Sequence, residues 1–319
     1  MNHQLLAVGA ALLATGLAVV PAAAEYPERA ITSIVPLNPG GGGDTGMRTW
    51  APYLERCLGG TQPVLVVNLP GAGNVIGFTY HAQQPADGYT IGTLNQPNMS
   101  IALVTKPDEL QFTLDTFDYY GNYFGNTLVV AVRADSPLQT LDDFIALAKT
   151  QPVNTGVTGP GTDDALVVDQ LVKQAEGAQI VQIPLGGTAP ITNGLLGGHV
   201  DAAVLTLASV KASEGQMRPL AVTAAERLAD TPDLPTMRES GIDIVSQSAH
   251  IIGGLKEIPA DIKAKLMACF DEIGKDEAFW AEADSRLLPR LPMTAEEATA
   301  YMKDETERLQ KLWEEDPWL

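Results

Sequence analysis

The chain of 319 residues is poor in cysteine, in aromatic residues and in positive charge. It has 20 lysine and arginine residues against 39 aspartate and glutamate residues, which gives a formal net charge of -19 at pH 7. A surface with this excess of negative charge repels phosphate groups, so nucleic acid and anionic membrane surfaces are poor partners. Beyond residue 24 no apolar run is long enough to span a bilayer. We therefore expect the mature chain to be soluble, and to bind no nucleic acid.

The sequence also lacks the short motifs of common enzyme classes. The glycines at 71, 73 and 77 do not have the spacing of a dinucleotide fingerprint. No Lys-Ser/Thr pair follows the polyglycine run, as a P-loop would require, and no G-x-S-x-G elbow occurs. No C-x-x-C pair or His/Cys cluster indicates a metal site. We expect no catalytic residues, no metal and no cofactor, and an exported enzyme is the less favoured alternative.

The first 24 residues have the pattern of a signal peptide. Leu5 to Val20 is apolar, and the small residues of 21–24 (PAAA) form a cleavage pattern. The chain is therefore expected to begin at Glu25 after export, with a periplasmic location. An uncleaved anchor stays open, because residues 1–4 contain no Lys or Arg.

Two cysteines, Cys57 and Cys269, stand far apart in the chain. In an oxidising compartment such a pair can form a disulfide. The long loop that it would close could contribute about 4–5 kcal/mol in the chain-entropy model. Two buried thiols are equally compatible with the sequence, because sequence does not supply the Cα distance that a bridge needs.

Strand and helix patterns alternate along most of the chain, which predicts an α/β protein built on parallel sheets. The pattern restarts after a strand at 127–134, and an apolar strand returns at 251–255. We therefore expect two lobes joined by a hinge. Residues 25–125 plus 250–319 are expected to form the first lobe, residues 126–249 the second, and the protein is expected to be a monomer.

Glycine-rich segments stand at three expected strand-to-helix junctions, at 36–44 (PLNPGGGGD), 159–162 and 185–188. Glycine lets backbone N–H groups approach a ligand closely, and the start of a helix adds unpaired N–H groups and a positive dipole end. Ligands of open α/β sheets bind outside the carboxyl ends of the strands. Two such halves form a cleft that can close by hinge motion, which indicates a receptor for a small anion.

The order of these and other motifs resembles the substrate-binding proteins of tripartite tricarboxylate transporters, often called Bug receptors. The resemblance rests on residues 26–31, 36–44, 68–73, 85–90, 186–190, 196–201, 218–223 and 234–241. It implies a two-domain periplasmic-binding-protein fold of type II, the Venus-flytrap arrangement. It also implies a small organic acid as ligand and the membrane permease subunits of a tripartite transporter as partner. A ligand-sensing partner of a membrane kinase would have the same fold and site.

In this family two strand–turn–helix loops, one from each domain, hold a carboxylate with the help of ordered water. The resemblance carries these loops to Leu37–Thr45 and Gly159–Asp164, supported by Leu185–Ala189. The expected ligand-binding residues are Leu37, Asn38, Gly41, Gly42, Gly43, Asp44, Thr45, Asn95, Gln96, Gly159, Gly161, Thr162, Asp163, Gly186, Gly187, Thr188 and Thr206. Several of these have a second interpretation, because Asp44 and Thr188 can cap helices and Asn95 and Gln96 can serve a turn.

Two positions depart from the family pattern. Leu185 stands where members often have an aromatic residue, and Asp163 and Asp164 stand where Ser or Thr and then His are common. A carboxylate in a partly desolvated cleft needs a hydrogen-bond donor. If Asp163 or Asp164 faces the cleft, we expect it to favour acids that also carry a hydroxyl or amino group. The alternative is that both are solvent-facing residues at a helix start.

Overall fold

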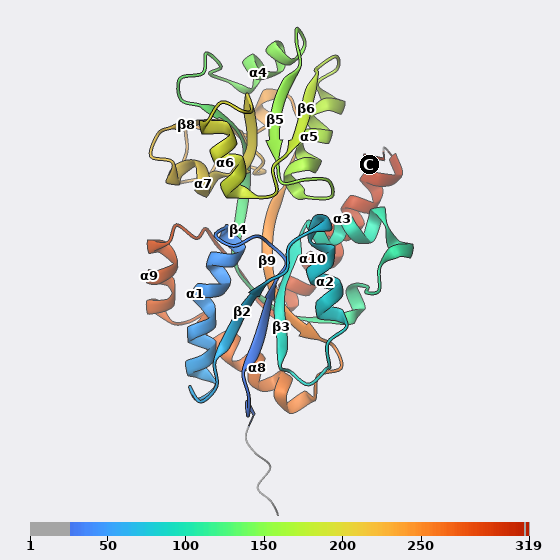
Figure 1. Ribbon diagram of the computed structural model, residues 1–319, viewed down its shortest axis with the longest axis vertical. Helices are drawn as coiled ribbons and strands as arrows, with labels where there is room; N and C mark the ends of the chain where they lie inside the picture. The colour runs from blue at the N-terminus through green and yellow to red at the C-terminus, as the bar shows by residue number, and fades with distance from the viewer. Residues whose placement is uncertain (1–25, 316, 319) are drawn as a thin grey trace, which may run out of the picture.

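The computed structural model describes residues 26–315, 317 and 318, which fold into two α/β lobes stacked along the long axis of the molecule (Figure 1). The signal peptide expected at 1–24, and with it the question of an uncleaved anchor, lies outside the described residues. The two-lobe α/β fold expected from the sequence is confirmed.

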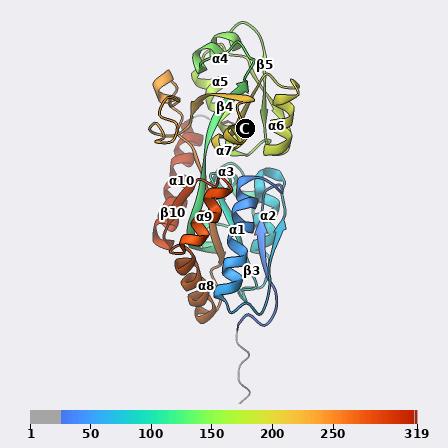
Figure 2. The ribbon, with the colours of Figure 1, turned by 90° about the vertical axis from the view of Figure 1, so that its left-hand side faces the viewer.

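The first lobe is built on parallel strands β1, β2 and β3, extended by antiparallel β9. Helices cover both faces of this sheet, and α10 lies on the opposite side of the molecule from α1 and α2 (Figure 2). The strands are β1 (Ile31–Val35), β2 (Val64–Asn68), β3 (Thr90–Gln96), β9 (Gln247–Leu255) and β10 (Arg290–Met293). The helices are α1 (Gly42–Cys57), α2 (Val75–Ala82), α3 (Asn98–Thr105), α8 (Ala260–Ile273), α9 (Glu277–Ser285) and α10 (Ala295–Glu315).

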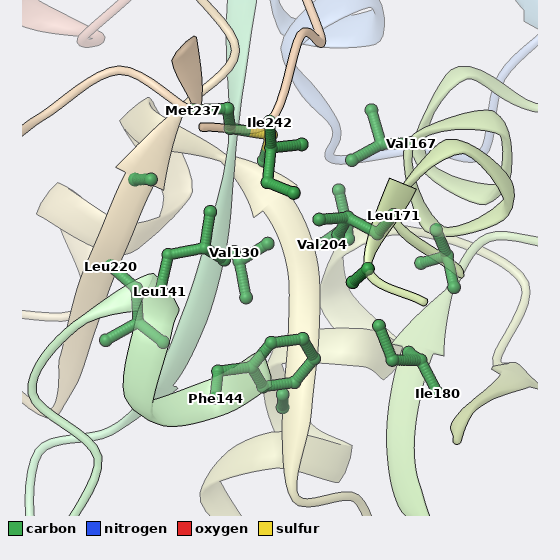
Figure 3. Packing of buried hydrophobic residues seen from close by; sticks show 14 of the residues in the cluster. Val130, Leu141, Phe144, Val167, Leu171, Ile180, Val204, Leu220, Met237 and Ile242 are labelled. Carbon is green, nitrogen blue, oxygen red and sulfur yellow. The ribbon is translucent and has the colours of Figure 1, made fainter. Parts of the chain in front are cut away.

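The second lobe repeats the scheme, with β5 pairing parallel to both β6 and β7. Its apolar core gathers side chains from the sheet and from α4 and α5 around Phe144 (Figure 3). The strands are β5 (Val153–Val157), β6 (Ile180–Pro184), β7 (Ala202–Thr206) and β8 (Met217–Val222). The helices are α4 (Leu141–Ala148), α5 (Asp163–Gln174), α6 (Thr188–Leu196) and α7 (Leu207–Ala212).

One long strand, β4 (Phe117–Arg133), belongs to both lobes. It pairs antiparallel with β9 from Phe117 to Thr127, and with β7 from Leu128 onward. The described strands form a single sheet in the order β2-β1-β3-β9-β4-β7-β5-β6. Strands β8 and β10 also belong to it and pair with β4. The lobes are therefore joined by the paired strands β4 and β9.

Three elements differ from the sequence-based expectation. The strand expected at 127–134 begins ten residues earlier, at Phe117, and Asn98 begins a short helix, α3. Strand β10 was not expected. The local pattern hid these elements, because the first half of β4 is interrupted by Gly121 and Gly125, and α3 is only eight residues long.

A disulfide joins the end of α1 to α8, which decides between the two states left open for the cysteines. Cys57 and Cys269 are bonded, with Cα atoms 5.7 Å apart and a separation of 212 positions in the sequence. Around the bridge, Leu54 and Phe270 pack in the core of the first lobe. The bridge therefore fixes α8, in the C-terminal part of the chain, against α1 near the N-terminal end.

We expect the Cys57→Ser/Cys269→Ser double variant to lose about 3–5 kcal/mol of unfolding free energy, because the bridge closes a very long loop in the unfolded chain. Guanidinium unfolding of the oxidised wild type and the variant measures the loss. The reduced wild type is the control and should match the variant. A variant as stable as the oxidised wild type would contradict the expectation.

Candidate functional site

A cavity of about 990 Å³ lies between the lobes, where loops at the ends of β1, β5 and β6 meet. Its lining includes all but two of the seventeen ligand-binding residues expected from the sequence. Those present are Leu37, Asn38, Gly41, Gly42, Gly43, Asn95, Gln96, Gly159, Gly161, Thr162, Asp163, Gly186, Gly187, Thr188 and Thr206. Their contact with a ligand stays a prediction, but the fold brings them to one cavity.

Asp44 and Thr45 are the two expected residues that do not line the cavity. The carboxylate of Asp44 is 3% exposed and accepts hydrogen bonds from Gly40 N–H, Arg48 Nε and Asn68 Nδ2, each at 2.9 Å. Burial acts to raise the pKa of Asp44, but these hydrogen bonds outweigh it and hold the pKa below its usual value. Asp44 thus fastens the turn before α1, and Thr45 lies in the first turns of that helix.

The glycines at the start of α1 allow this loop to lie directly against the strands below it. A Cβ atom at Gly43 would lie 2.5 Å from Leu37 Cδ1 and 3.0 Å from His250 Nδ1. A Cβ at Gly42 would lie 3.1 Å from Asn126 Nδ2. Larger residues would therefore push the helix start away from the cavity or fill it.

The loops of the two lobes touch at the rim of the cavity. Asn38 Nδ2 donates a hydrogen bond to the carbonyl oxygen of Gly186 in the other lobe. Gly73 has a φ of +63°, and a Cβ there would lie 2.8 Å from the carbonyl oxygen of Gly161. Only glycine combines this backbone conformation with so close an approach. The lobes are therefore in a closed arrangement.

The two aspartates at the start of α5 have different partners. Asp164 accepts hydrogen bonds from Thr158 N–H (2.6 Å), Ala165 N–H (2.9 Å) and the Thr162 hydroxyl, so it closes its own loop. Asp163 instead accepts a hydrogen bond from the hydroxyl of Ser248, on the crossing strand β9. Burial raises the pKa of both groups; with the neighbouring Asp164 charge, it brings that of Asp163 to about 6.

Four side chains on one face of β3, β4 and β9 form what we call the polar floor: Asn95, Asn126, Ser248 and His250. Asn95 stands opposite His250 in the β3–β9 pairing, and Asn126 stands opposite Ser248 in the β4–β9 pairing. His250 is 8% exposed, and burial lowers its pKa to about 4, so its ring is neutral. Its Nε2 lies 2.8 Å from Asn126 Nδ2.

Sequence reasoning did not assign Asn126, Ser248 and His250 to the site. The alternation of Ser248 and His250 along a strand indicates a shared face, but their position against Asn126 depends on pairing across more than a hundred residues. It also missed α3, from which Asn98, Thr105 and the exposed Lys106 beyond its end reach the lining. Lys106, Asp163, Asp164 and His250 are the titratable side chains among the described lining residues.

Within residues 26–315, 317 and 318, no group of three or more His, Cys, Asp or Glu side chains is placed to hold a metal ion. None of the helices in that part of the chain is long and apolar enough to cross a membrane.

A hinged pair of α/β lobes with a cavity at the strand ends defines a periplasmic-binding-protein fold. Residues 47–316 match the model of the tripartite tricarboxylate transporter family receptor, and the chain belongs to this family. A protein from Cupriavidus necator, "UPF0065 protein in gbd 5'region", is 32% identical over 82% of this chain and 81% of its own length. Protein BugT from Bordetella pertussis is 33% identical over 76% and 74% of the respective chains.

Solved structures agree with this assignment. The periplasmic binding protein BugD is 27% identical, with a TM-score of 0.81 over 91% of this chain and 98% of its own. Two proteins from Rhodopseudomonas palustris show the same fold. They are MatC with bound malate (23% identity, TM-score 0.79, covering 90% and 99%) and Rpa4515 with adipate (24% identity, TM-score 0.81, covering 91% and 97%). The family is one of receptors, and BugD is a periplasmic binding protein.

We expect the Asp163→Asn variant to be more stable than the wild type above pH 6 when no ligand is bound. The pKa of Asp163 in the folded state, about 6, lies above its value in the unfolded chain. Between pH 4 and 6 the folded state therefore binds more protons than the unfolded state. The free energy of unfolding of the wild type falls as pH rises through that window. The amide removes this loss while keeping an acceptor for Ser248. Chemical unfolding should give a gain of about 1–3 kcal/mol at pH 7.5 that vanishes near pH 3.5.

The matched control for this experiment is Asp142→Asn, an exposed acidic residue in the first turn of α4. It removes one negative charge from a helix start in the same lobe, away from the cavity. An equal gain in both variants, or a gain at Asp163 that does not depend on pH, would show that burial of Asp163 is not the cause.

Proposed function

We propose that the protein is an exported solute receptor, without enzymatic activity, that binds a small organic anion in the interlobe cavity. The observation that carries this proposal is the meeting of two helix starts, α1 and α6, with their glycine-rich loops at one cavity. Membership of the receptor family supports it. The malate and adipate bound by two proteins of the same fold support a carboxylate as the ligand class.

The carboxylate would accept hydrogen bonds from the backbone of residues 41–43 and 186–188. Helix dipoles each contribute about 0.3–2 kcal/mol to such an anion, with the larger values at buried sites. Side-chain amides of Asn95, Gln96 and Asn126 and the Thr206 hydroxyl would bind other polar groups of the ligand. This scheme needs no arginine.

We propose residues 25–125 plus 250–319 as one rigid lobe and 126–249 as the other. The partners of β4 support the division, because they change from β9 to β7 between Thr127 and Leu128. Thr127 on β4 stands opposite Gln247, the first residue of β9. The two strands that join the lobes, β4 and β9, therefore meet the second lobe at the same paired position. The hinge would then lie at this pair, a few residues before position 250 on the returning strand.

We further propose a periplasmic location and delivery of the ligand, by a monomer, to the permease subunits of a tripartite tricarboxylate transporter. Family membership supports the partner and the location. Ligand-dependent crosslinking of the purified receptor to membranes containing the permease would test the partner.

The proposed site is tested by Gly42→Leu. Its side chain would start 3.1 Å from Asn126 Nδ2 and fill the space in front of the α1 loop. Native mass spectrometry of the freshly purified protein should first identify a small carboxylic acid. Calorimetry with that acid should then give micromolar or tighter binding to the wild type, about 8 kcal/mol or more, and none to the variant.

The control is Ala264→Leu, which adds the same side chain on the exposed face of α8 and should bind as the wild type does. Circular dichroism must show both variants folded. Undiminished affinity in Gly42→Leu would place the site elsewhere.

Closure about the β4–β9 pair should reduce the radius of gyration when ligand is added, because binding draws the loops of the two lobes together. Small-angle scattering of the ligand-stripped protein, with and without the identified acid, measures this. The proposed lobes are tested by crystal structures of the two forms. Residues 126–249 should move as one body, and a moving block with other boundaries would contradict the division.

A further inference from the structure

The helices that begin at the cavity include α1, α5 and α6, and the starts of these three differ in charge. The starts of α1 and α6 bring no acidic side chain to the lining, since Asp44 is turned into its own hydrogen bonds. The start of α5 carries both Asp163 and Asp164, which do line the cavity. A helix start favours a negative charge nearby. At α5 the protein's own aspartates supply that charge. A ligand carboxylate is therefore directed to the loops before α1 and α6.

Of the two aspartates, Asp163 has capacity left for a ligand. Asp164 accepts three hydrogen bonds from its own loop. Asp163 accepts a hydrogen bond from Ser248 at Oδ2 and is also stabilised by backbone N–H groups of residues 163 and 164, but no cation among the described residues acts on its pKa. A partly buried carboxylate without a cationic partner remains unfavourable, so a further donor from a ligand would stabilise it.

The polar floor beside Asp163 also has atoms without a partner. The Oδ1 atom of Asn95 and the Nδ1 atom of His250 are buried and form no hydrogen bond within the described structure. Asn126 Nδ2 can only donate, so His250 Nε2 accepts and Nδ1 carries the proton. The polar floor thus contains an unused acceptor at Asn95, whereas the unused Nδ1 of His250 lies beside Gly43, where an added Cβ would be 3.0 Å from it. A ligand that satisfies this cavity must itself bring a hydrogen-bond donor.

From this arrangement we propose that Asp163 selects the ligand: the receptor takes carboxylic acids that carry an ammonium or hydroxyl group, in preference to plain dicarboxylates. This inference rests on the proposed function. The donor group of the ligand would lie against Asp163, and its carboxylate would lie against the loops before α1 and α6. A plain dicarboxylate leaves Asp163 without a donor from the ligand, which is unfavourable for a partly buried carboxylate.

The titratable groups around Asp163 allow us to predict whether ligand affinity rises or falls with pH. Asp164 lies beside it on α5, His250 lies on β9, and Tyr301 on α10 interacts with it electrostatically. His250 is neutral above a pKa of about 4, and burial raises the pKa of Tyr301 so that its hydroxyl stays protonated. Affinity for a donor-bearing acid should therefore rise from pH 5 to pH 8 as Asp163 ionises. A protonated Asp163 that donates to a ligand carboxylate would give the opposite slope.

The experiment uses the full mature protein, freed of bound solute by unfolding and refolding with its disulfide intact. Calorimetry compares succinate, malate and aspartate, which differ only in hydrogen, hydroxyl or ammonium at one carbon, and then glutarate, 2-hydroxyglutarate and glutamate. Wild type should bind the donor-bearing members of one series at least about 10-fold more tightly than the plain member. The Asp163→Asn variant should reduce that preference about 10- to 100-fold, the range for a hydrogen bond to a charged group. Asp142→Asn should leave it unchanged.

The outcomes separate this inference from the proposed function. If acids bind but Asp163→Asn keeps the wild-type preference, if plain acids are preferred, or if affinity falls from pH 5 to pH 8, the role of Asp163 is wrong and the receptor function stands. If neither series binds and the solute that co-purifies is not a carboxylic acid, both are wrong. A plain dicarboxylate as the co-purified solute overturns the inference alone.

Discussion

The antiparallel pairing of β4 with β9 is the constraint on which the rest of the structure depends. These strands carry the sheet from one lobe into the other, and β4 is buried along nearly its whole length. The same pairing places Asn126 beside Ser248 and His250, so the connection between the lobes is also the floor of the cavity. A bend at the Thr127–Gln247 pair would therefore move the loops of the second lobe against a floor that stays attached to both. In the proposed function, closure of the lobes and recognition of the ligand therefore depend on the same pair of strands, β4 and β9.

The electrostatics of the cavity follow from the way its loops are closed. A chain of net charge -19 attracts no anion at long range, so an anion must be held by local groups. Glycine-rich turns supply backbone N–H groups without side chains, and Arg48 is committed to Asp44 and Asn68. Because these donors are backbone groups, fixed by β1 and β6, they can recognise a carboxylate but discriminate little among carboxylates. Discrimination then falls to the side chains, among which Asp163 carries a charge and lines the cavity.

The sequence predicted the parts of the site that are local in the chain. Glycines between a strand and a helix indicated the loops at 36–44, 159–162 and 185–188, the family resemblance extended the second loop to Asp164, and all three reach the cavity. The polar floor could not be predicted, because Asn126 and His250 meet only through strand pairing over a long separation. Asp44 was left with two interpretations, because a carboxylate near a helix start can serve a ligand or the turn. The choice depends on Arg48 and Asn68, which pair with it.

Asp163 illustrates why a binding site can oppose stability. Its burial raises its pKa, which means that the folded, empty protein carries an unfavourable charge at neutral pH. A residue chosen for stability alone would be neutral, such as asparagine, and Ser248 could pair with it equally well. Groups with strongly shifted pKa values concentrate at functional sites because their missing interaction is supplied by a ligand. The same carboxylate that weakens the empty protein would strengthen its hold on a ligand that brings a donor, so the free energy lost on folding is recovered on binding.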